Sequence, residues 1–111
     1  MRRGDIVAVD LGPARGSRTD MSRLAVIVSN DAADSARADT ITLVPLTSNI
    51  ERIYPFQVLL DATVTGLPRD VKAQAEQVRS IAVDRIGQTR GHLPRAQIRK
   101  VDAALRAHLA V

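Results

Sequence analysis

The stretch Arg23-Leu-Ala-Val-Ile-Val-Ser29 decides how this chain folds. Five consecutive apolar residues stand between an arginine and a serine. A run of this length that is apolar at every position is typical of a strand buried on both faces. We therefore predict a central strand over residues 23–29. Arg23 directly precedes the apolar run, so we expect its charged head at the mouth of this strand.

Shorter strand candidates lie on both sides of this run. Residues 5–10 read Asp-Ile-Val-Ala-Val-Asp and are rich in β-branched side chains, which favour strands. Residues 40–46 alternate polar and apolar at first, but Pro45 cannot donate a hydrogen bond to a neighbouring strand. We therefore expect this strand to end at Pro45 or to lie at a sheet edge. Residues 56–60 form a fourth strand, and residues 71–82 form one or two weaker ones.

The remaining segments are loops, apart from the C-terminal one. Glycine, proline and small polar residues mark residues 11–22 as a loop, and residues 30–39 as a loop or a single helical turn. Residues 82–91 are mixed. From Pro94 the apolar positions recur at helical spacing, and proline suits a helix start. These positions are Ile98, Val101, Leu105 and Leu109.

Together these elements predict a mainly β fold with a C-terminal α-helix. Five or six short strands followed by one amphipathic helix form a small curled β-barrel with the helix against it. The 111 residues allow one core, and we predict a single domain over residues 1–111. No apolar run approaches the roughly 20 residues of a membrane helix, so we expect a cytoplasmic protein.

Composition excludes several functional classes. The chain has no cysteine, which excludes disulfides, thiolate zinc sites and a cysteine nucleophile. Tyr54 and Phe56 are its only aromatic residues besides histidine, which argues against a protein that stacks many nucleic-acid bases. Neither a phosphate-binding glycine loop nor a histidine metal motif occurs.

The charge of the chain favours an anionic partner. Sixteen basic residues, fourteen of them arginine, stand against twelve acidic ones, and the formal charge is +4. Residues 61–111 carry the whole of this excess. A basic balance suggests a polyanion such as nucleic acid. The alternative is that most of these arginines lie on solvated faces without a specific role.

Polar residues gather at the predicted strand ends, where small barrels build sites. Such residues also punctuate turns by bonding to the nearby backbone, and most of them need no other explanation. Arg23 is harder to dismiss because it abuts a fully apolar strand. The other polar residues in these positions are Ser17, Arg18, Thr19, Asp20, Asn30, Thr47, Ser48, Asn49, Glu76, Gln77 and Arg79.

Four stretches of the sequence, spread over nearly the whole chain, stand out as motifs. They are Arg3-Gly4-Asp5-Ile6-Val7 with Asp10, Pro13 and Gly16-Ser17; Arg23 to Asn30-Asp31; Val44-Pro45-Leu46-Thr47-Ser48; and Ala75-Glu76-Gln77-Val78-Arg79-Ser80-Ile81. In these residues and in their order, the chain resembles the MazF/PemK family of toxin endoribonucleases.

The resemblance implies an SH3-like barrel (CcdB/MazF-like) that forms a homodimer. It implies a toxin that cuts single-stranded RNA at short sequences, with neither metal nor other cofactor. The 2′-hydroxyl attacks its own phosphate, leaving a 2′,3′-cyclic phosphate and a 5′-hydroxyl. The expected partner is an acidic, partly disordered antitoxin that folds as it binds and covers the RNA groove.

The same resemblance implies roles for individual residues. Arg23 matches the catalytic arginine, and its role is to stabilise charge on the phosphorane, with proton donation as a second role. Thr47 matches the catalytic hydroxyl. Glu76 takes the place of an acid–base carboxylate, although Gln74 replaces the arginine that accompanies it in some members. Ser48 is expected to contact phosphate.

RNA binding is expected to use Arg15, Ser17 and Arg18 from the first loop, together with Asn30 and Gln77. Arg18 stands where the family has a glutamate. Two alternatives remain open at the level of sequence. One is a CcdB-like toxin that binds a protein target such as gyrase, and the other is a catalytically inactive relative that binds RNA or antitoxin.

Overall fold

The central strand of the sheet is β2 (Ser22–Ile27), between β1 (Asp5–Asp10) and β3 (Thr40–Thr47). This computed structural model describes residues 1–11, 22–30 and 39–111. Ala25, Val26 and Ile27 are each at most 2% exposed, because both faces of β2 are covered. The predicted buried strand is therefore confirmed, although it ends at Ile27 rather than at residue 29.

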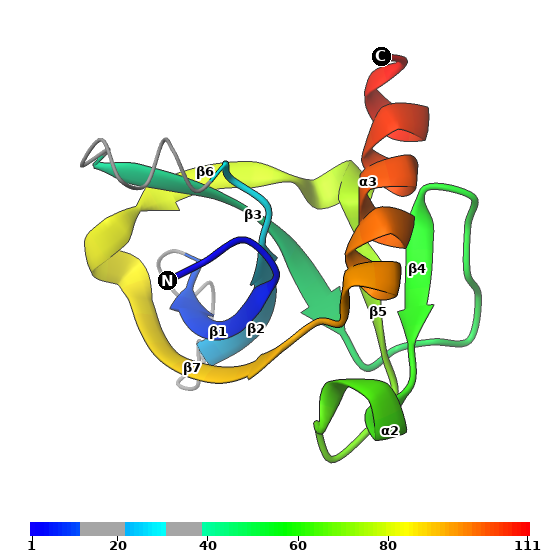
Figure 1. Ribbon diagram of the computed structural model, residues 1–111, viewed down its shortest axis with the longest axis horizontal. Coiled ribbons are helices and arrows are strands. Elements are labelled where there is room, and N and C mark those ends of the chain that lie inside the picture. The colour runs from blue at the N-terminus through cyan, green and yellow to red at the C-terminus, as the bar shows by residue number, and fades with distance from the viewer. Residues whose placement is uncertain (12–21, 31–38) are drawn as a thin grey trace, which may run out of the picture.

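The described strands form one curved antiparallel sheet in the order β4-β5-β3-β2-β1-β7, with β6 also paired to β3 (Figure 1). The further strands are β4 (Gln57–Leu60), β5 (Val71–Gln74), β6 (Arg79–Ala82) and β7 (Ile86–His92). Short helical turns, α2 (Ala62–Thr65), η1 (Ala75–Gln77) and η2 (Val83–Arg85), connect them. The mainly β class with a C-terminal helix is confirmed. Among the described strands, however, the hydrogen-bonded path has two ends and does not close into a complete barrel.

The described residues form seven strands, whereas the sequence predicted five or six, because the hydrophobic pattern does not reveal β7. Its side chains are exposed or half-buried along the whole strand. It is held through its backbone pairing with β1, and register shifts interrupt that pairing. A strand stabilised in this way does not need alternating apolar and polar residues, so the sequence pattern does not reveal it.

The expectation that the strand over residues 40–46 ends at Pro45 or lies at an edge is wrong. β3 continues to Thr47 in the interior of the sheet. On one side it pairs with β2, and on the other its partner changes from β6, which pairs up to Leu43, to β5, which pairs from Leu46. Pro45 lies at this change of partner, where a residue without an N–H is tolerated.

Two apolar clusters cover the two faces of the central strands. Ile6, Val26 and Val44 belong to the cluster beneath the C-terminal helix, while Val7 and Ile27 belong to the cluster on the opposite face. Neighbouring residues of β1 and β2 thus enter different clusters, as the alternation of side chains along a strand requires.

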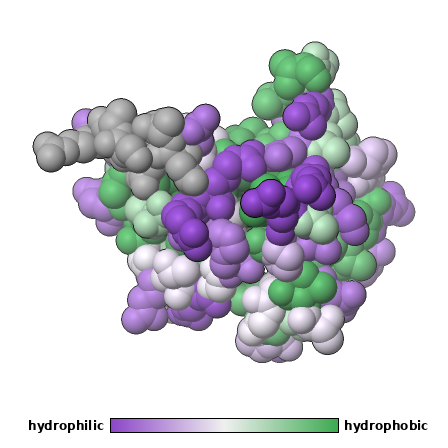
Figure 2. All heavy atoms as spheres, in the orientation of Figure 1, coloured by the Kyte–Doolittle hydropathy of each residue, from purple (hydrophilic) through white to green (hydrophobic). Residues whose placement is uncertain are grey.

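The predicted C-terminal helix is confirmed as α3 (Arg95–Leu109), with Pro94 at its N-cap. Val101 and Ala104 are its buried residues, and it packs against β4 and η1 (Figure 1). Its C-terminal end projects from the molecule with hydrophobic residues, including Leu109, at its tip (Figure 2). In the described ranges, no helix has the length and apolar character needed to cross a membrane.

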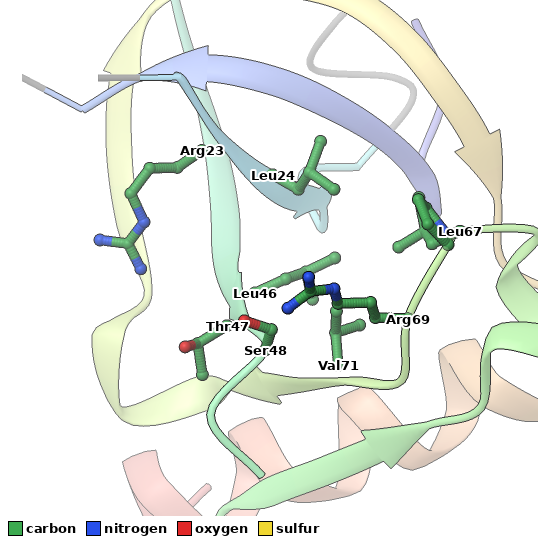
Figure 3. Close-up of a pocket in the computed structure, with 9 residues that line it drawn as sticks. Arg23, Leu24, Leu46, Thr47, Ser48, Leu67, Arg69 and Val71 are labelled. Carbon is green, nitrogen blue, oxygen red and sulfur yellow. The ribbon is translucent and has the colours of Figure 1, made fainter. Parts of the chain in front are cut away.

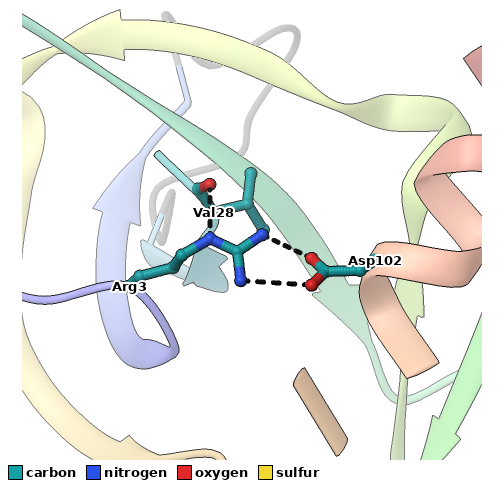
Figure 4. Close-up of polar contacts among 3 residues, drawn as sticks. All are labelled: Arg3, Val28 and Asp102. Carbon is teal, nitrogen blue, oxygen red and sulfur yellow. Dashed lines mark hydrogen bonds and ion pairs between the residues drawn. The ribbon is translucent and has the colours of Figure 1, made fainter. Parts of the chain in front are cut away.

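Arg3 fastens the N-terminal segment to α3. Its guanidinium forms an ion pair with Asp102 through two nitrogens, and its Nε donates a hydrogen bond to the Val28 carbonyl at 3.1 Å (Figure 4). Gly4 follows with a φ of +94°, and a Cβ there would lie 2.5 Å from Cδ1 of Ile98. The positive φ therefore favours glycine at position 4, and the approach of Ile98 leaves little room for a side chain there.

Asp5 forms a second polar link, with His92 of β7. His92 Nδ1 lies 2.7 Å from one carboxylate oxygen of Asp5, and the Arg2 N–H donates to the other at 2.7 Å. Burial raises the pKa of the Asp5 carboxyl, but the hydrogen bonds from His92 and Arg2 and the charge of His92 outweigh it, so the pKa is lowered overall.

We expect Leu60→Ala to destabilise the protein by about 2–5 kcal/mol, since Leu60 is fully buried in the cluster beneath α3. The matched control is Leu59→Ala, one residue earlier on β4, because Leu59 is 45% exposed and faces away from that cluster. Urea unfolding gives both values. Equal losses for the two variants would contradict the assigned register of β4.

We expect the stability contributed by Asp5 to be lost on acidification. A carboxyl with a lowered folded pKa stabilises the fold above its unfolded pKa of about 3.9, and this contribution disappears as pH falls through the folded pKa. Asp5→Asn removes it at neutral pH and flattens the acid limb. Urea unfolding between about pH 6 and pH 2 measures this. The exposed Asp84→Asn serves as control, and identical acid limbs for Asp5→Asn and wild type would contradict the assignment.

Candidate active site

A pocket of about 390 Å³ opens where β2 begins and β3 ends (Figure 3). Its wall and floor include buried apolar side chains, of which Leu46, Leu67 and Val71 are each at most 8% exposed. Its polar groups come from exposed or half-buried residues at strand ends and in one loop. These are Arg23, Thr47, Ser48 and Arg69.

Strand register brings Arg23 and Thr47 together. β2 and β3 pair as Ile27 with Leu43, Val26 with Val44 and Ala25 with Pro45. This pairing ends at Ala25 and Pro45, and Arg23 and Thr47 lie two residues beyond it on their strands. There Arg23 pairs with β1 and Thr47 with β5. The neighbouring ends of β2 and β3 therefore bring both residues to the same pocket.

The Thr47 side chain is oriented by the turn that follows β3. Its Oγ1 accepts the N–H of Asn49 at 3.2 Å. A hydroxyl that accepts in this way keeps its own proton for donation. Ser48 is exposed directly beside it on the pocket rim.

Arg69 enters the pocket from the loop between α2 and β5, and sequence reasoning did not select it. Figure 3 shows its guanidinium pointing into the pocket toward Ser48, whereas Arg23 extends on the β2 side. Arg69 lies two residues before β5, near a strand end like the predicted residues. That position before a predicted strand is the signal in the sequence that could identify Arg69.

The two arginines give the pocket an uncompensated positive charge. With the described residues, neither the Arg23 nor the Arg69 side chain makes a hydrogen bond or ion pair, and no carboxylate lines the pocket. Asp70, beside Arg69, instead accepts the Ala62 N–H at 2.8 Å. Such a pocket suits an anionic group, because guanidinium donors match phosphate oxygens.

The structure places Glu76 elsewhere. Glu76 lies in η1 and does not line the pocket. One carboxylate oxygen accepts Nε2 of Gln57 at 2.8 Å, and the other is buried without a partner among the described residues. Gln57 in turn accepts the Tyr54 N–H at 3.1 Å. The acid–base role predicted for Glu76 at the Arg23–Thr47 pair does not follow from this geometry, because a proton acceptor must reach the reacting hydroxyl.

The other predicted binding residues do not share the pocket either. Asn30 lies three residues beyond the end of β2 opposite to Arg23 and does not line the pocket. Gln77 is exposed at the end of η1. Arg15, Ser17 and Arg18 lie outside the described residues. Of the predicted site, the structure thus brings together Arg23, Thr47 and Ser48.

The described residues do not form a metal-binding cluster. In residues 1–11, 22–30 and 39–111, no three histidine, aspartate or glutamate side chains are grouped as the ligands of a metal ion would be. The positive charge that faces a bound anion in this pocket comes from guanidinium groups.

Comparison with known proteins gives consistent matches along the chain. The family model described as "PemK-like, MazF-like toxin of type II toxin-antitoxin system" matches residues 2–109. Endoribonuclease MazF9 of Mycobacterium tuberculosis is 53% identical over 113 residues, covering 98% of this chain and 96% of the relative. Endoribonuclease EndoA of Bacillus subtilis is 31% identical over 112 residues, covering 100% of this chain and 96% of the relative.

Two solved structures share the fold. One is an endoribonuclease in complex with its cognate antitoxin from a mycobacterial species, with a TM-score of 0.82, 23% identity and coverage of 100% of this chain and 96% of that one. The other is MazF from Deinococcus radiodurans, with a TM-score of 0.78, 25% identity and coverage of 100% and 97%.

Proposed function

The chain belongs to the PemK-like, MazF-like family of toxins of type II toxin–antitoxin systems, and from this premise we propose that it is a metal-independent endoribonuclease of single-stranded RNA. The observation that carries the proposal is the pocket that Arg23 and Thr47 line together, at the neighbouring ends of β2 and β3. The full-length relatives reported above are named endoribonucleases. They favour RNA cleavage over the gyrase-binding and inactive alternatives.

In the proposed reaction the 2′-hydroxyl oxygen of one nucleotide attacks the adjoining phosphorus. A bond forms between this oxygen and phosphorus, and the bond from phosphorus to the 5′-oxygen of the next nucleotide breaks. The 2′-hydroxyl loses a proton and the departing 5′-oxygen gains one. The products are a 2′,3′-cyclic phosphate and a 5′-hydroxyl, and DNA is not a substrate because it lacks the nucleophile.

The pocket residues stabilise the charge that develops in this step. Negative charge accumulates on the non-bridging oxygens of the phosphorane, and donors aimed at those oxygens lower the barrier. Arg23 supplies a guanidinium with no competing described partner. Thr47 retains a hydroxyl proton to donate to the phosphate, since its oxygen already accepts the Asn49 N–H. Ser48 adds a further hydroxyl at the rim.

Membership of a toxin–antitoxin family implies the partners. We propose a homodimer that an acidic, partly disordered antitoxin inhibits by covering the positively charged pocket. The RNA substrate places the activity in the cytoplasm. A single domain over residues 1–111 carries both RNA cleavage and antitoxin binding. Further RNA contacts come from Arg15, Ser17, Arg18, Asn30 and Gln77.

We expect Arg23→Ala to lower the single-turnover cleavage rate by about 10²-fold or more, because it removes the charge that faces the phosphorane. Thr47→Ala is expected to lower it by about 10-fold to 10²-fold. The rates are measured on single-stranded RNA in the presence of EDTA. Arg106→Gln, an exposed change on α3 with the same loss of charge as Arg23→Ala, is the control. Wild-type rates for folded Arg23→Ala would refute the assignment of this pocket, and strong inhibition by EDTA would refute the metal-free reaction.

We expect Glu76→Gln to change the single-turnover rate by less than about tenfold, since Glu76 lies outside the pocket and an effective general base contributes 10²-fold or more. The amide preserves the size of the side chain and a hydrogen bond with Gln57. A loss of about 10²-fold would restore the predicted acid–base role of Glu76.

A further inference from the structure

Arg69 extends the proposed function to a second phosphate. We infer that Arg69 binds the RNA phosphate next to the scissile one, so that the pocket holds two successive phosphates between two arginines. The inference rests on the proposed function, and it deepens that function by naming how the same pocket holds its substrate.

The first argument is charge matching. Each phosphodiester carries one negative charge, so a single scissile phosphate leaves one of two unpaired guanidinium groups uncompensated. The Arg23 and Arg69 side chains both line the pocket without a described partner. They reach it from different sides, Arg23 from β2 and Arg69 from the loop before β5, with the hydroxyl-bearing residues Thr47 and Ser48 on the rim (Figure 3).

The second argument is that the loop holds Arg69 in place. Gly66 ends α2 with a φ of +78°, and its N–H bonds to the Ala62 carbonyl at 2.8 Å. Thr65 Oγ1 accepts the Leu67 N–H at 3.1 Å, and Leu67 is 8% exposed in the pocket wall. On the other side of Arg69, Val71 pairs with Leu60 of β4. A backbone fixed on both sides of an arginine lowers the entropy lost when that arginine binds an anion.

The third argument is that the neighbouring carboxylate does not neutralise Arg69. Asp70 turns its Oδ1 to the Ala62 N–H at the start of α2. The Arg69 guanidinium therefore faces the pocket, while the Asp70 carboxylate is hydrogen-bonded to the backbone of α2. This arrangement is expected of a residue that contacts phosphate, because an internal ion pair would compete with the ligand.

These arguments predict a residue that binds substrate without taking part in the bond change. Its removal should raise KM and leave kcat nearly unchanged, because a contact made equally in ground and transition states contributes binding alone. It should also reduce the salt dependence of binding, by about 0.7 in the slope of log K against log salt for one phosphate of a single strand.

The test compares Arg69→Gln, Arg69→Lys and the charge-matched control Arg106→Gln. The probe is a fluorescein-labelled RNA that carries the mapped cleavage sequence with a 2′-deoxy sugar at the scissile position, so that it binds without being cut. We expect Arg69→Gln to weaken binding about tenfold and to lower the salt slope, Arg69→Lys to retain the slope with intermediate affinity, and Arg106→Gln to match wild type.

A second set of probes locates the phosphate. Each carries one uncharged methylphosphonate, at the scissile position or at either neighbour. Wild-type protein should lose affinity when the neighbour that Arg69 binds is neutralised, and Arg69→Gln should show no further loss there. A loss of affinity that persists in Arg69→Gln at both neighbours would overturn the inference.

Kinetics separate failure of this inference from failure of the proposed function. If wild type cleaves RNA while Arg69→Gln has the wild-type KM and salt slope, Arg69 does not bind a phosphate. In that case the inference is wrong and the proposed function still holds. If Arg69→Gln loses kcat with unchanged KM, Arg69 acts on the scissile phosphate and the assignment to its neighbour is overturned. If wild-type protein does not cleave RNA, the proposed function and the inference with it are overturned.

Discussion

The antiparallel register between β2 and β3 is the constraint on which the candidate site depends. It brings the start of β2 next to the end of β3, so that Arg23, Thr47 and the apolar Leu24 and Leu46 line one pocket. A slip of one residue would turn every side chain of β2 to the other face. Two apolar clusters prevent this, because Val26 enters one and Ile27 the other. The core therefore specifies the geometry of the pocket as well as the stability of the fold.

Ion pairs and hydrogen bonds distinguish the arginines that stabilise the fold from those available to bind a ligand. The chain has fourteen arginines, and its charge alone says little about which of them bind an anion. Arg3 is satisfied by Asp102 and the Val28 carbonyl, and it ties the N-terminal segment to α3. Arg23 and Arg69 have no such partner among the described residues, yet they share one concave surface. An anion that enters this pocket meets positive charge that no described carboxylate compensates.

Much of this arrangement could be predicted from the sequence because it follows from local pattern. The apolar run after Arg23 and the helical spacing from Pro94 gave the right elements, and strand-end position together with family resemblance selected Arg23, Thr47 and Ser48. The rest depends on non-local pairing. β7 is held through the backbone of β1, and Pro45 is tolerated where β3 changes partner from β6 to β5. Asn30 and Arg23 lie toward opposite ends of β2, so they do not share a site. Arg69 reaches the pocket only through the fold of the loop between α2 and β5.

The most direct test of the account is the chemistry of the RNA ends. Purified protein is incubated with a single-stranded RNA and with the same RNA carrying one 2′-deoxy sugar at the mapped cleavage position, and the products are identified by mass spectrometry. Attack by the 2′-hydroxyl predicts a 2′,3′-cyclic phosphate and a 5′-hydroxyl from the first substrate and no cut in the second. A 5′-phosphate with a 3′-hydroxyl, or cleavage of the deoxy-substituted RNA at that position, would contradict it.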